Sequence, residues 1–266
     1  MGIRNHHPHM LYPPNSCNFR CFHIQLYCRL EHIHRNRNTL ELKKLAEYIL
    51  RFNRGGLLRF LSQQETSTAI ERMLRRAKIP VAYSQGFHPH PKISYAPAVP
   101  TGVASSALYL KLTTTEEDDG IFEKLNMYSI FTLRILDVWK ITEDINFQEL
   151  VEKYYYTLYL PKKAFDPKKF SPDALVEKQG KKKLKIFKAA EVYENFGFSE
   201  LSDYFMVKYF QPVSKLVSYQ KLLKILSNTD EVSEKCVYVY VKDAVFQGKY
   251  LKEILNNIGG KENVRS

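Results

Sequence analysis

The segment RGGLLRFLSQQETSTAIERMLRRAKIP (54–80) decides the fold, because it predicts a strand followed at once by a helix. Residues 54–62 are rich in leucine and phenylalanine and predict a short strand. Ser62 is then placed as an N-cap, and Glu65 three residues later completes a capping box. Apolar residues at helical spacing after Glu65 predict a helix that runs up to the proline at the end of the segment.

The residues that follow complete a β-α-β-β-α-β order. The expected elements are an extended stretch over 81–84, a strand over 107–113, a helix over 118–129 and a strand over 132–141. This order is the ferredoxin-like signature, which implies an antiparallel sheet with helices on one face and the other face free to bind a ligand.

The second half of the chain fits the same order. The expected elements are a strand over 153–160, a short helix near 173–178, strands over 183–189 and 203–210, a helix over 218–228 and a strand over 236–246. The predicted fold class is therefore α+β, with two tandem ferredoxin-like (βαββαβ) units that have antiparallel sheets. The predicted boundaries are an extension over 1–42, a first unit over 43–146, a second unit over 147–246, and a C-terminal helix and tail over 247–266.

The first 42 residues differ in composition from the rest. Six of the eight histidines, three of the four cysteines and five arginines fall here, whereas the first lysine is Lys43. This shift predicts a disordered extension or a start site assigned too far upstream. The alternative is a metal site, for which the candidate ligands are Cys17, Cys21, Cys28, His32 and His34. Their spacing matches neither the usual C-x-x-C zinc knuckles nor the iron–sulfur motif of radical S-adenosylmethionine (radical SAM) enzymes, so neither a metal nor another cofactor is expected.

The bulk composition indicates a globular, cytoplasmic protein. Hydrophobic residues make up 44% of the chain, and the longest apolar run falls short of the ~20 residues that cross a bilayer. The N-terminus lacks the order of a secretory signal, so neither secretion nor a membrane contact is expected. The formal net charge of +12 favours a polyanionic partner such as RNA or a ribonucleoprotein. A lysine-rich proteome is the alternative explanation for that charge.

The segment YSQGFHPHPKISYAP (83–97) is the second distinctive feature. Gly86 allows a sharp turn, and the two prolines that follow stiffen an extended path carrying His88 and His90. Aromatic side chains here can stack on an RNA base while nearby cations contact phosphates. The predicted binding residues are Arg59, Arg72, Arg75, Arg76, Tyr83, Ser84, Gly86, Phe87, His88, His90, Lys92 and Ser94.

Three interpretations of this segment stay open from the residues alone. It is a binding surface, or a structural loop in which His90 hydrogen-bonds across the loop, or a catalytic or metal site. In the catalytic case His90 acts as general base with Tyr83 or Lys92, as in an RNA-processing endonuclease.

The same segment resembles the radical SAM-linked protein family, a bacterial domain of unknown function found beside or fused to cobalamin-binding radical SAM proteins. The family phrase L-R-R-A-G-L-P-x-x-Y-S-x-G-F-N-P-H-P-R-x-S-F-A matches the chain from Leu74 onward. The matching positions are Leu74, Arg75, Arg76, Ala77, Pro80, Tyr83, Ser84, Gly86, Phe87, Pro89, His90, Pro91 and Ser94, with Lys92 and Tyr95 as like-for-like replacements. The chain departs from the pattern at His88, where the family has Asn, and at Gln63 and Glu65, where it has His and Asp.

The resemblance implies an association with a radical SAM enzyme and a link to ribosome or RNA metabolism. Combined with the charge, it predicts a non-catalytic accessory protein that presents RNA or a ribonucleoprotein to that enzyme. The alternatives are the endonuclease that uses His90 and an adaptor that contacts only protein.

Overall fold

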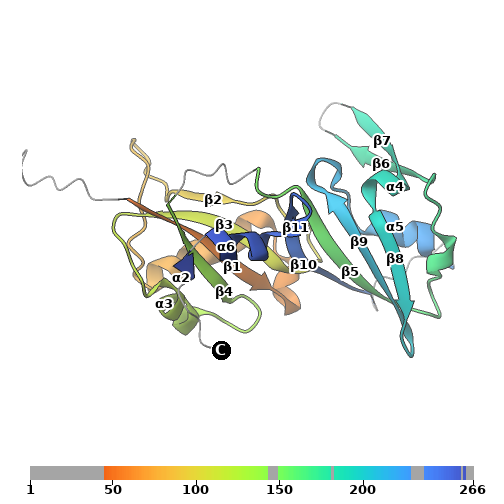
Figure 1. Cartoon of the computed structure of the whole chain (residues 1–266), viewed down its shortest axis with the longest axis horizontal. Coiled ribbons are helices and arrows are strands. Elements are labelled where there is room, and N and C mark those ends of the chain that lie inside the picture. Colours follow the sequence, from red (N-terminus) through yellow and green to blue (C-terminus); the bar gives the residue numbers. More distant parts are fainter. Residues whose placement is uncertain (1–44, 143–148, 181–182, 229–236, 259, 262–266) are drawn as a thin grey trace, which may run out of the picture. The chain divides into compact units, whose positions relative to one another are not determined.

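A computed structural model describes residues 45–142, 149–180, 183–228, 237–258 and 260–261. Within these residues the protein is a mixed α+β fold with one large, mostly antiparallel sheet and few helices (Figure 1). Each described helix falls short of the length and apolar character that a membrane crossing requires. The predicted extension and its candidate metal ligands lie outside the described residues.

The large sheet has ten strands. They are β1 (Ala46–Arg54), β2 (Ile93–Tyr95), β3 (Ala104–Thr114), β4 (Ile135–Ile141), β5 (Lys153–Pro161), β8 (Glu194–Glu200), β9 (Tyr204–Pro212), β10 (Tyr238–Phe246), β11 (Lys249–Tyr250) and β12 (Gly260–Lys261). A separate hairpin pairs β6 (Leu175–Gln179) with β7 (Leu184–Lys188).

The described helices are short. The α-helices are α2 (Gln63–Arg76), α3 (Ile121–Tyr128), α4 (Ala189–Val192), α5 (Gln220–Leu226) and α6 (Leu251–Ile258). The 3₁₀ turns are η1 (Gly56–Phe60), η2 (Pro167–Lys169) and η3 (Val213–Lys215).

The strands follow the order β12-β4-β1-β3-β10-β5-β9-β8, with β2 paired to β3 and β11 paired to β10. All the ladders of this sheet are antiparallel except the pairing of β3 with β10, which is parallel. That pairing links only Tyr240 to Ala104 and Val241 to Ser105. The two predicted sets of strands thus form one continuous sheet, where two separate antiparallel sheets had been expected (Figure 1).

The predicted strand over 54–62 is wrong, because the first strand precedes it and ends at Arg54. The glycine pair then breaks the extended path, since Gly56 has φ +51°, and the leucines that follow form η1. The capping box is confirmed. The Ser62 N–H donates to Glu65 Oε2 at 2.8 Å, and the Glu65 N–H donates to Ser62 Oγ at 3.2 Å.

In the second half the predicted helix near 173–178 is also wrong. Leu175–Gln179 is β6, which buries only Val176 against the core and pairs with β7. The predicted strand over 183–189 is found as β7, and those over 153–160, 203–210 and 236–246 are found as β5, β9 and β10. Strand β8 was not predicted.

The first half of the sheet has side chains packed on both faces. On one face, α2 and α3 bury Leu74 and Leu125 against Leu50 of β1. On the other face Trp139 is buried, and its indole N–H donates to Asn256 Oδ1 of α6 at 3.0 Å. The predicted free face of the first half is therefore wrong, since α6, from the end of the chain, packs on it.

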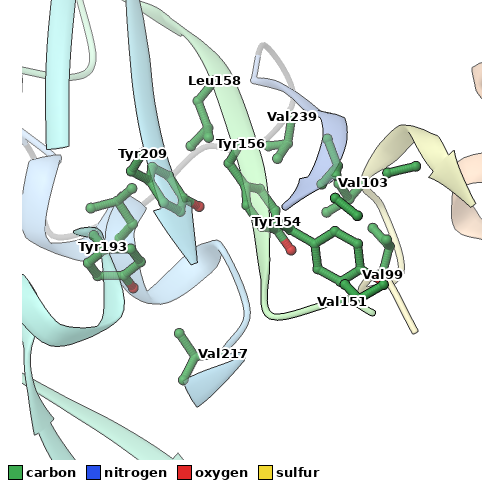
Figure 2. Packing of buried hydrophobic residues seen from close by; sticks show 14 of the residues in the cluster. Val99, Val103, Val151, Tyr154, Tyr156, Leu158, Tyr193, Tyr209, Val217 and Val239 are labelled. Atoms are coloured by element: carbon green, nitrogen blue, oxygen red, sulfur yellow. The ribbon is translucent and has the colours of Figure 1, made fainter. Parts of the chain in front are cut away.

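Tyrosine rings form much of the second core (Figure 2). Tyr156 of β5 and Tyr209 of β9 are opposite one another in the ladder, and their rings stack with centroids 5.1 Å apart. Tyr193 meets Tyr209 edge-on, also at 5.1 Å. Helices α4 and α5 cover this side of the strands, with Leu222 and Leu223 fully buried.

The short β3–β10 pairing is reinforced by Arg51, whose guanidinium is buried. It donates to the Ser106 carbonyl of β3 at 2.6 Å and to the Lys242 carbonyl of β10 at 3.3 Å. It also forms an ion pair with Asp137 of β4 at 2.9 Å and lies 4.0 Å from Asp243 of β10. One side chain therefore links three strands across the junction.

Asp243 is a buried carboxyl group at this junction. Burial raises the pKa of its carboxyl, although Arg51 favours the charged form and the Tyr109 hydroxyl donates to Asp243 Oδ1 at 2.6 Å. The Ala244 N–H also donates to Asp243 Oδ1 at 2.8 Å, so the buried carboxylate depends on these three partners.

Replacing Arg51 with methionine is expected to lower the free energy of unfolding by about 3–5 kcal/mol, because the buried Asp243 would lose its nearest cation while Asp137 would keep only its ion pair with Lys252 at 3.3 Å. Denaturant titration followed by circular dichroism measures the change. Lys188→Met is the control, because its ion pair with Asp173 is exposed and should contribute little. Equal stability of the two variants would contradict the role assigned to Arg51.

Alkaline pH is expected to destabilise the protein through its core tyrosines. Burial raises the pKa of Tyr154, Tyr156, Tyr193 and Tyr209 in the folded state, whereas tyrosines of the unfolded chain ionise near the ordinary value of about 10. Their contribution to stability is thus complete below about pH 10 and is lost as the pH rises towards the folded-state values.

Denaturant titrations between about pH 8 and pH 11 test this expectation. Tyr209→Phe is the matched variant, since the buried Tyr209 hydroxyl has no hydrogen-bond partner among the described residues. This variant should show a shallower loss of stability with pH. A free energy of unfolding that stays constant over this range would contradict the assignment.

Candidate functional site

The second half of the sheet has a face opposite the one that α4 and α5 cover. Side chains alternate along β5, so that Tyr154 and Tyr156 enter the core while Tyr155 and Tyr159 point the other way. We call this second face the open sheet face. Its described members include Tyr155, Tyr159, Met206, Lys208, Phe210, Tyr238, Tyr240, Lys242 and Tyr250.

Aromatic rings on the open sheet face are paired across strands. Tyr155 lies opposite Phe210 of β9, and their rings stack with centroids 4.9 Å apart and planes at 29°. Tyr250 of β11 leans against Tyr155 at 5.9 Å. Tyr159 and Tyr238 of β10 are also opposite one another, with centroids 6.3 Å apart. Such cross-strand pairs fix the ring positions before any ligand binds.

A hollow of about 360 Å³ lies over β8 and β9 at this face. Its lining residues are Tyr155, Asn195, Gly197, Phe198, Ser199, Met206, Lys208, Phe210 and Tyr250. Gly197 lies opposite Lys208 in the ladder, and a side chain at this position would project towards no atom within 4 Å. The hollow therefore combines an aromatic wall, a cation and polar groups on strand β8.

This face carries two exposed lysines, whereas the carboxylates of Asp243 and Glu253 lie close enough to Tyr250 to raise the pKa of its hydroxyl. Lys208 and Lys242 are exposed, and the Lys242 ammonium lies 5.9 Å from the Tyr250 ring centroid. The nearest acidic side chain at the end of β8, Glu194, already pairs with Lys153 at 2.6 Å. Among the described residues, no ion pair involves Lys208 or Lys242, so both cations are available to a ligand.

Tyrosine hydroxyls at the open sheet face stay protonated at neutral pH. Partial burial raises the pKa of Tyr155, Tyr238 and Tyr250 above the ordinary value. Each therefore offers a hydrogen-bond donor beside its ring. Stacking surfaces, ammonium groups and neutral donors together match the chemistry of an unpaired nucleotide.

The predicted binding residues are located mainly in the first half. Arg72, Arg75 and Arg76 are exposed on α2. Tyr83, Arg75 and Pro91 line a small hollow of about 120 Å³ together with Glu71, Leu74, Ile79, Val81 and Ile93. The structure thus brings Arg75 and Tyr83 together, as the sequence predicted.

The motif loop, residues 83–94, is closed by two hydrogen bonds between Ser84 and His90. The Ser84 N–H donates to the His90 carbonyl at 2.8 Å, and the His90 N–H donates to Ser84 Oγ at 3.0 Å. Phe87 is 94% exposed beyond this closure and meets the His88 ring edge-on at 4.8 Å. His90 does bond across the loop, but through its backbone.

The candidate catalytic groups are not joined to one another. Among the described residues, no side-chain hydrogen bond links His90 to Tyr83 or to Lys92. Lys92 and Ser94 are exposed beside β2, where Ser94 pairs with Lys111 of β3. Cys17, Cys21 and Cys28 lie outside the described residues.

Arg59 is separated from the other predicted residues. Its guanidinium lies 5.5 Å from the Tyr238 ring centroid and 4.8 Å from that of Phe60. The Nε atom of Arg59 is buried and has no hydrogen-bond partner among the described residues. Arg59 therefore borders the open sheet face, through Tyr238, and not the motif loop.

Sequence reasoning did not select Tyr155, Lys208, Phe210 and Tyr250 as site residues. A signal was present, because YYYTLY (154–159) and YFMVKYF (204–210) alternate and so place every second ring on one face. The missing information was the register that sets Tyr155 against Phe210, which depends on the pairing of β5 with β9.

Gly86→Ala is expected to strain the motif loop, because Gly86 has φ +148°, a backbone conformation that costs a side-chain-bearing residue about 1–3 kcal/mol. The new methyl group would contact no atom within 4 Å, so the effect is one of backbone conformation. Amide hydrogen exchange should show faster exchange at the Ser84 and His90 N–H groups. Gly55→Ala is the control, since Gly55 has φ −137° and equally open surroundings; unchanged exchange in Gly86→Ala would contradict the prediction.

Comparisons with known proteins identify the family of this chain and do not identify its function. A search of curated proteins found no match to the chain. A family model described as an uncharacterized protein conserved in bacteria (DUF2344) matches residues 47–209, from the first strand of the sheet to the middle of β9. The prediction of a bacterial domain of unknown function is confirmed at this level, and the radical SAM association stays a prediction. Because the match covers more than half of its length, the chain belongs to the DUF2344 family of proteins conserved in bacteria.

Proposed function

We propose that this protein is a non-catalytic RNA-binding accessory protein that presents RNA or a ribonucleoprotein to a radical SAM enzyme. The observation that carries the RNA part is the open sheet face, where the stacked Tyr155–Phe210 pair borders a hollow beside the exposed Lys208. The enzyme part rests on the family phrase that includes Tyr83, Ser84 and Gly86.

The proposal includes a finer interpretation of the fold, in which each half is a ferredoxin-like unit. The strands of the first half are arranged in the order β4-β1-β3-β2, and those of the second half in the order β10-β5-β9-β8. If the four strands of each half are numbered along the chain, both halves have the spatial order 4-1-3-2. RNA-recognition sheets of this class carry their aromatic rings on the central strands. The pair Tyr155–Phe210 occupies the two central strands of the second unit.

Stacking and charge support RNA over an acidic protein as ligand. The rings at this face are half-exposed and held at fixed spacing, which suits flat bases of any sequence. Lys208 and Lys242 add a charge contribution that depends on salt. The Arg72, Arg75 and Arg76 side chains on α2 lie in the other half and are available to a second contact, such as the partner enzyme.

Direct RNA binding is the test of this proposal. Fluorescence anisotropy with single-stranded RNA and with tRNA should show binding that weakens steeply with salt. Tyr155→Ala and Phe210→Ala should each weaken binding about tenfold, because losing a stacking partner costs about 1–3 kcal/mol. Lys208→Ala should lower the salt slope by about 0.7.

Two controls keep this test specific. Phe131→Ala removes a ring that is 87% exposed in the first half, and Lys188→Ala removes an exposed lysine of β7; neither should alter RNA binding. RNA cleavage that disappears in His90→Ala would instead support the endonuclease. A radical SAM protein that co-purifies from the native cell without RNA would favour the adaptor that contacts only protein.

A further inference from the structure

We infer that the open sheet face holds three consecutive nucleotides of a single strand in a fixed register. The first base stacks at Tyr155–Phe210, the third at Tyr159–Tyr238, and a phosphate between them lies at Lys208. This inference rests on the proposed function and adds the length and the register of the bound segment.

The two ring pairs act as two separate stacking positions. The first, Tyr155–Phe210, joins β5 to β9, and the second, Tyr159–Tyr238, joins β5 to β10. Tyr155 and Tyr159 are four residues apart on one strand, which corresponds to about 13 Å. Because both have the same parity along β5, their rings are on the same face.

The separation of these positions sets the number of nucleotides. A helical strand advances only about 3.4 Å for each nucleotide, so two neighbouring stacked bases cannot reach both positions. A ferredoxin-like RNA-binding sheet instead holds two or three bases of a splayed strand. A spacing of about 13 Å therefore suits the first and third bases of an extended trinucleotide.

A cation lies midway between the two positions. Thr157 is two residues from both Tyr155 and Tyr159, and the ladder places Lys208 directly opposite it. Lys208 also lines the hollow of about 360 Å³ beside the first position. An ammonium group here contacts a phosphate that connects the two stacked bases.

Arg59 adds a second cation at the second position. Its guanidinium lies 5.5 Å from the Tyr238 ring centroid. A guanidinium at this place can contact a phosphate of the bound strand through its terminal N–H groups.

The hollow extends from the level of the first position towards that of the second. Asn195 and Ser199 line it from β8, and Ser199 is opposite Met206, which is itself opposite Tyr159. Polar side chains that can hydrogen-bond to a base edge therefore lie along the path between the two stacking positions.

The test measures the affinity of oligouridylates of increasing length, from the dinucleotide upward, by competition against a labelled RNA. Wild-type affinity should rise at least tenfold from the dinucleotide to the trinucleotide and change little beyond the tetranucleotide. In Tyr159→Ala this gain should disappear while dinucleotide binding stays within about twofold. Tyr155→Ala should weaken both, and Tyr159→Phe should behave as wild type.

The outcomes separate this inference from the function it rests on. If neither short oligouridylates nor tRNA binds, the RNA-binding function itself is wrong. Two other results would show that the proposed register is wrong while RNA binding stands. In the first, tRNA binds but the affinity for oligouridylates does not increase at three nucleotides. In the second, Tyr159→Ala weakens binding of the dinucleotide and the trinucleotide equally. Thermal unfolding of each variant, compared with wild type, shows whether a loss of binding reflects a loss of folding.

Discussion

Arg51 holds the sheet together at the point where its β-ladder is shortest. Strands β3 and β10 share only two residue pairs, yet all the strands of the second half connect to the first through them. The Arg51 guanidinium bonds to carbonyl oxygens on both strands and neutralises Asp137 and Asp243. Ser106 strengthens the same contact, because its hydroxyl accepts from Tyr240 of β10 at 2.7 Å. A buried polar cluster of this kind is costly when incomplete, so it selects one geometry of the junction.

The junction also determines which surface is left for a ligand. On the first half α6 packs on the sheet face that would otherwise be open, and the Trp139–Asn256 bond holds it there. On the second half α4 and α5 are on the side of Tyr156 and Tyr209, so the opposite side keeps its rings at least half-exposed and its lysines exposed. The aromatic pairs are built from three strands, β5, β9 and β10, whose register is set by the long antiparallel ladders. The stacking positions are therefore as rigid as the sheet itself.

Local signals in the sequence predict much of this fold. The capping box at Ser62 and the alternation in β5, β9 and β10 are decided by neighbours within a few residues, and these elements are found as expected. The errors arise where distant contacts decide. Leu57 and Leu58 look like strand residues, but the Gly55–Gly56 pair turns the chain, and Leu175–Gln179 is a strand because β7 pairs with it. The candidate site also combines local and distant signals. Alternation along each strand places Tyr155 and Lys208 on the outward face, but only the pairing of β5 with β9 and β10 brings them to one hollow.

RNA bound at the open sheet face can be distinguished directly from RNA bound at the motif loop and α2. Photo-crosslinking to RNA that contains 4-thiouridine, followed by mass spectrometry of the crosslinked peptides, compares the two surfaces in one experiment. If RNA binds the open sheet face, crosslinks should form at Tyr155, Phe210 or Tyr250, and excess unlabelled RNA should remove them. Crosslinks confined to Arg72–Arg76 and residues 83–94 would contradict binding at the open sheet face and return the RNA site to the motif loop.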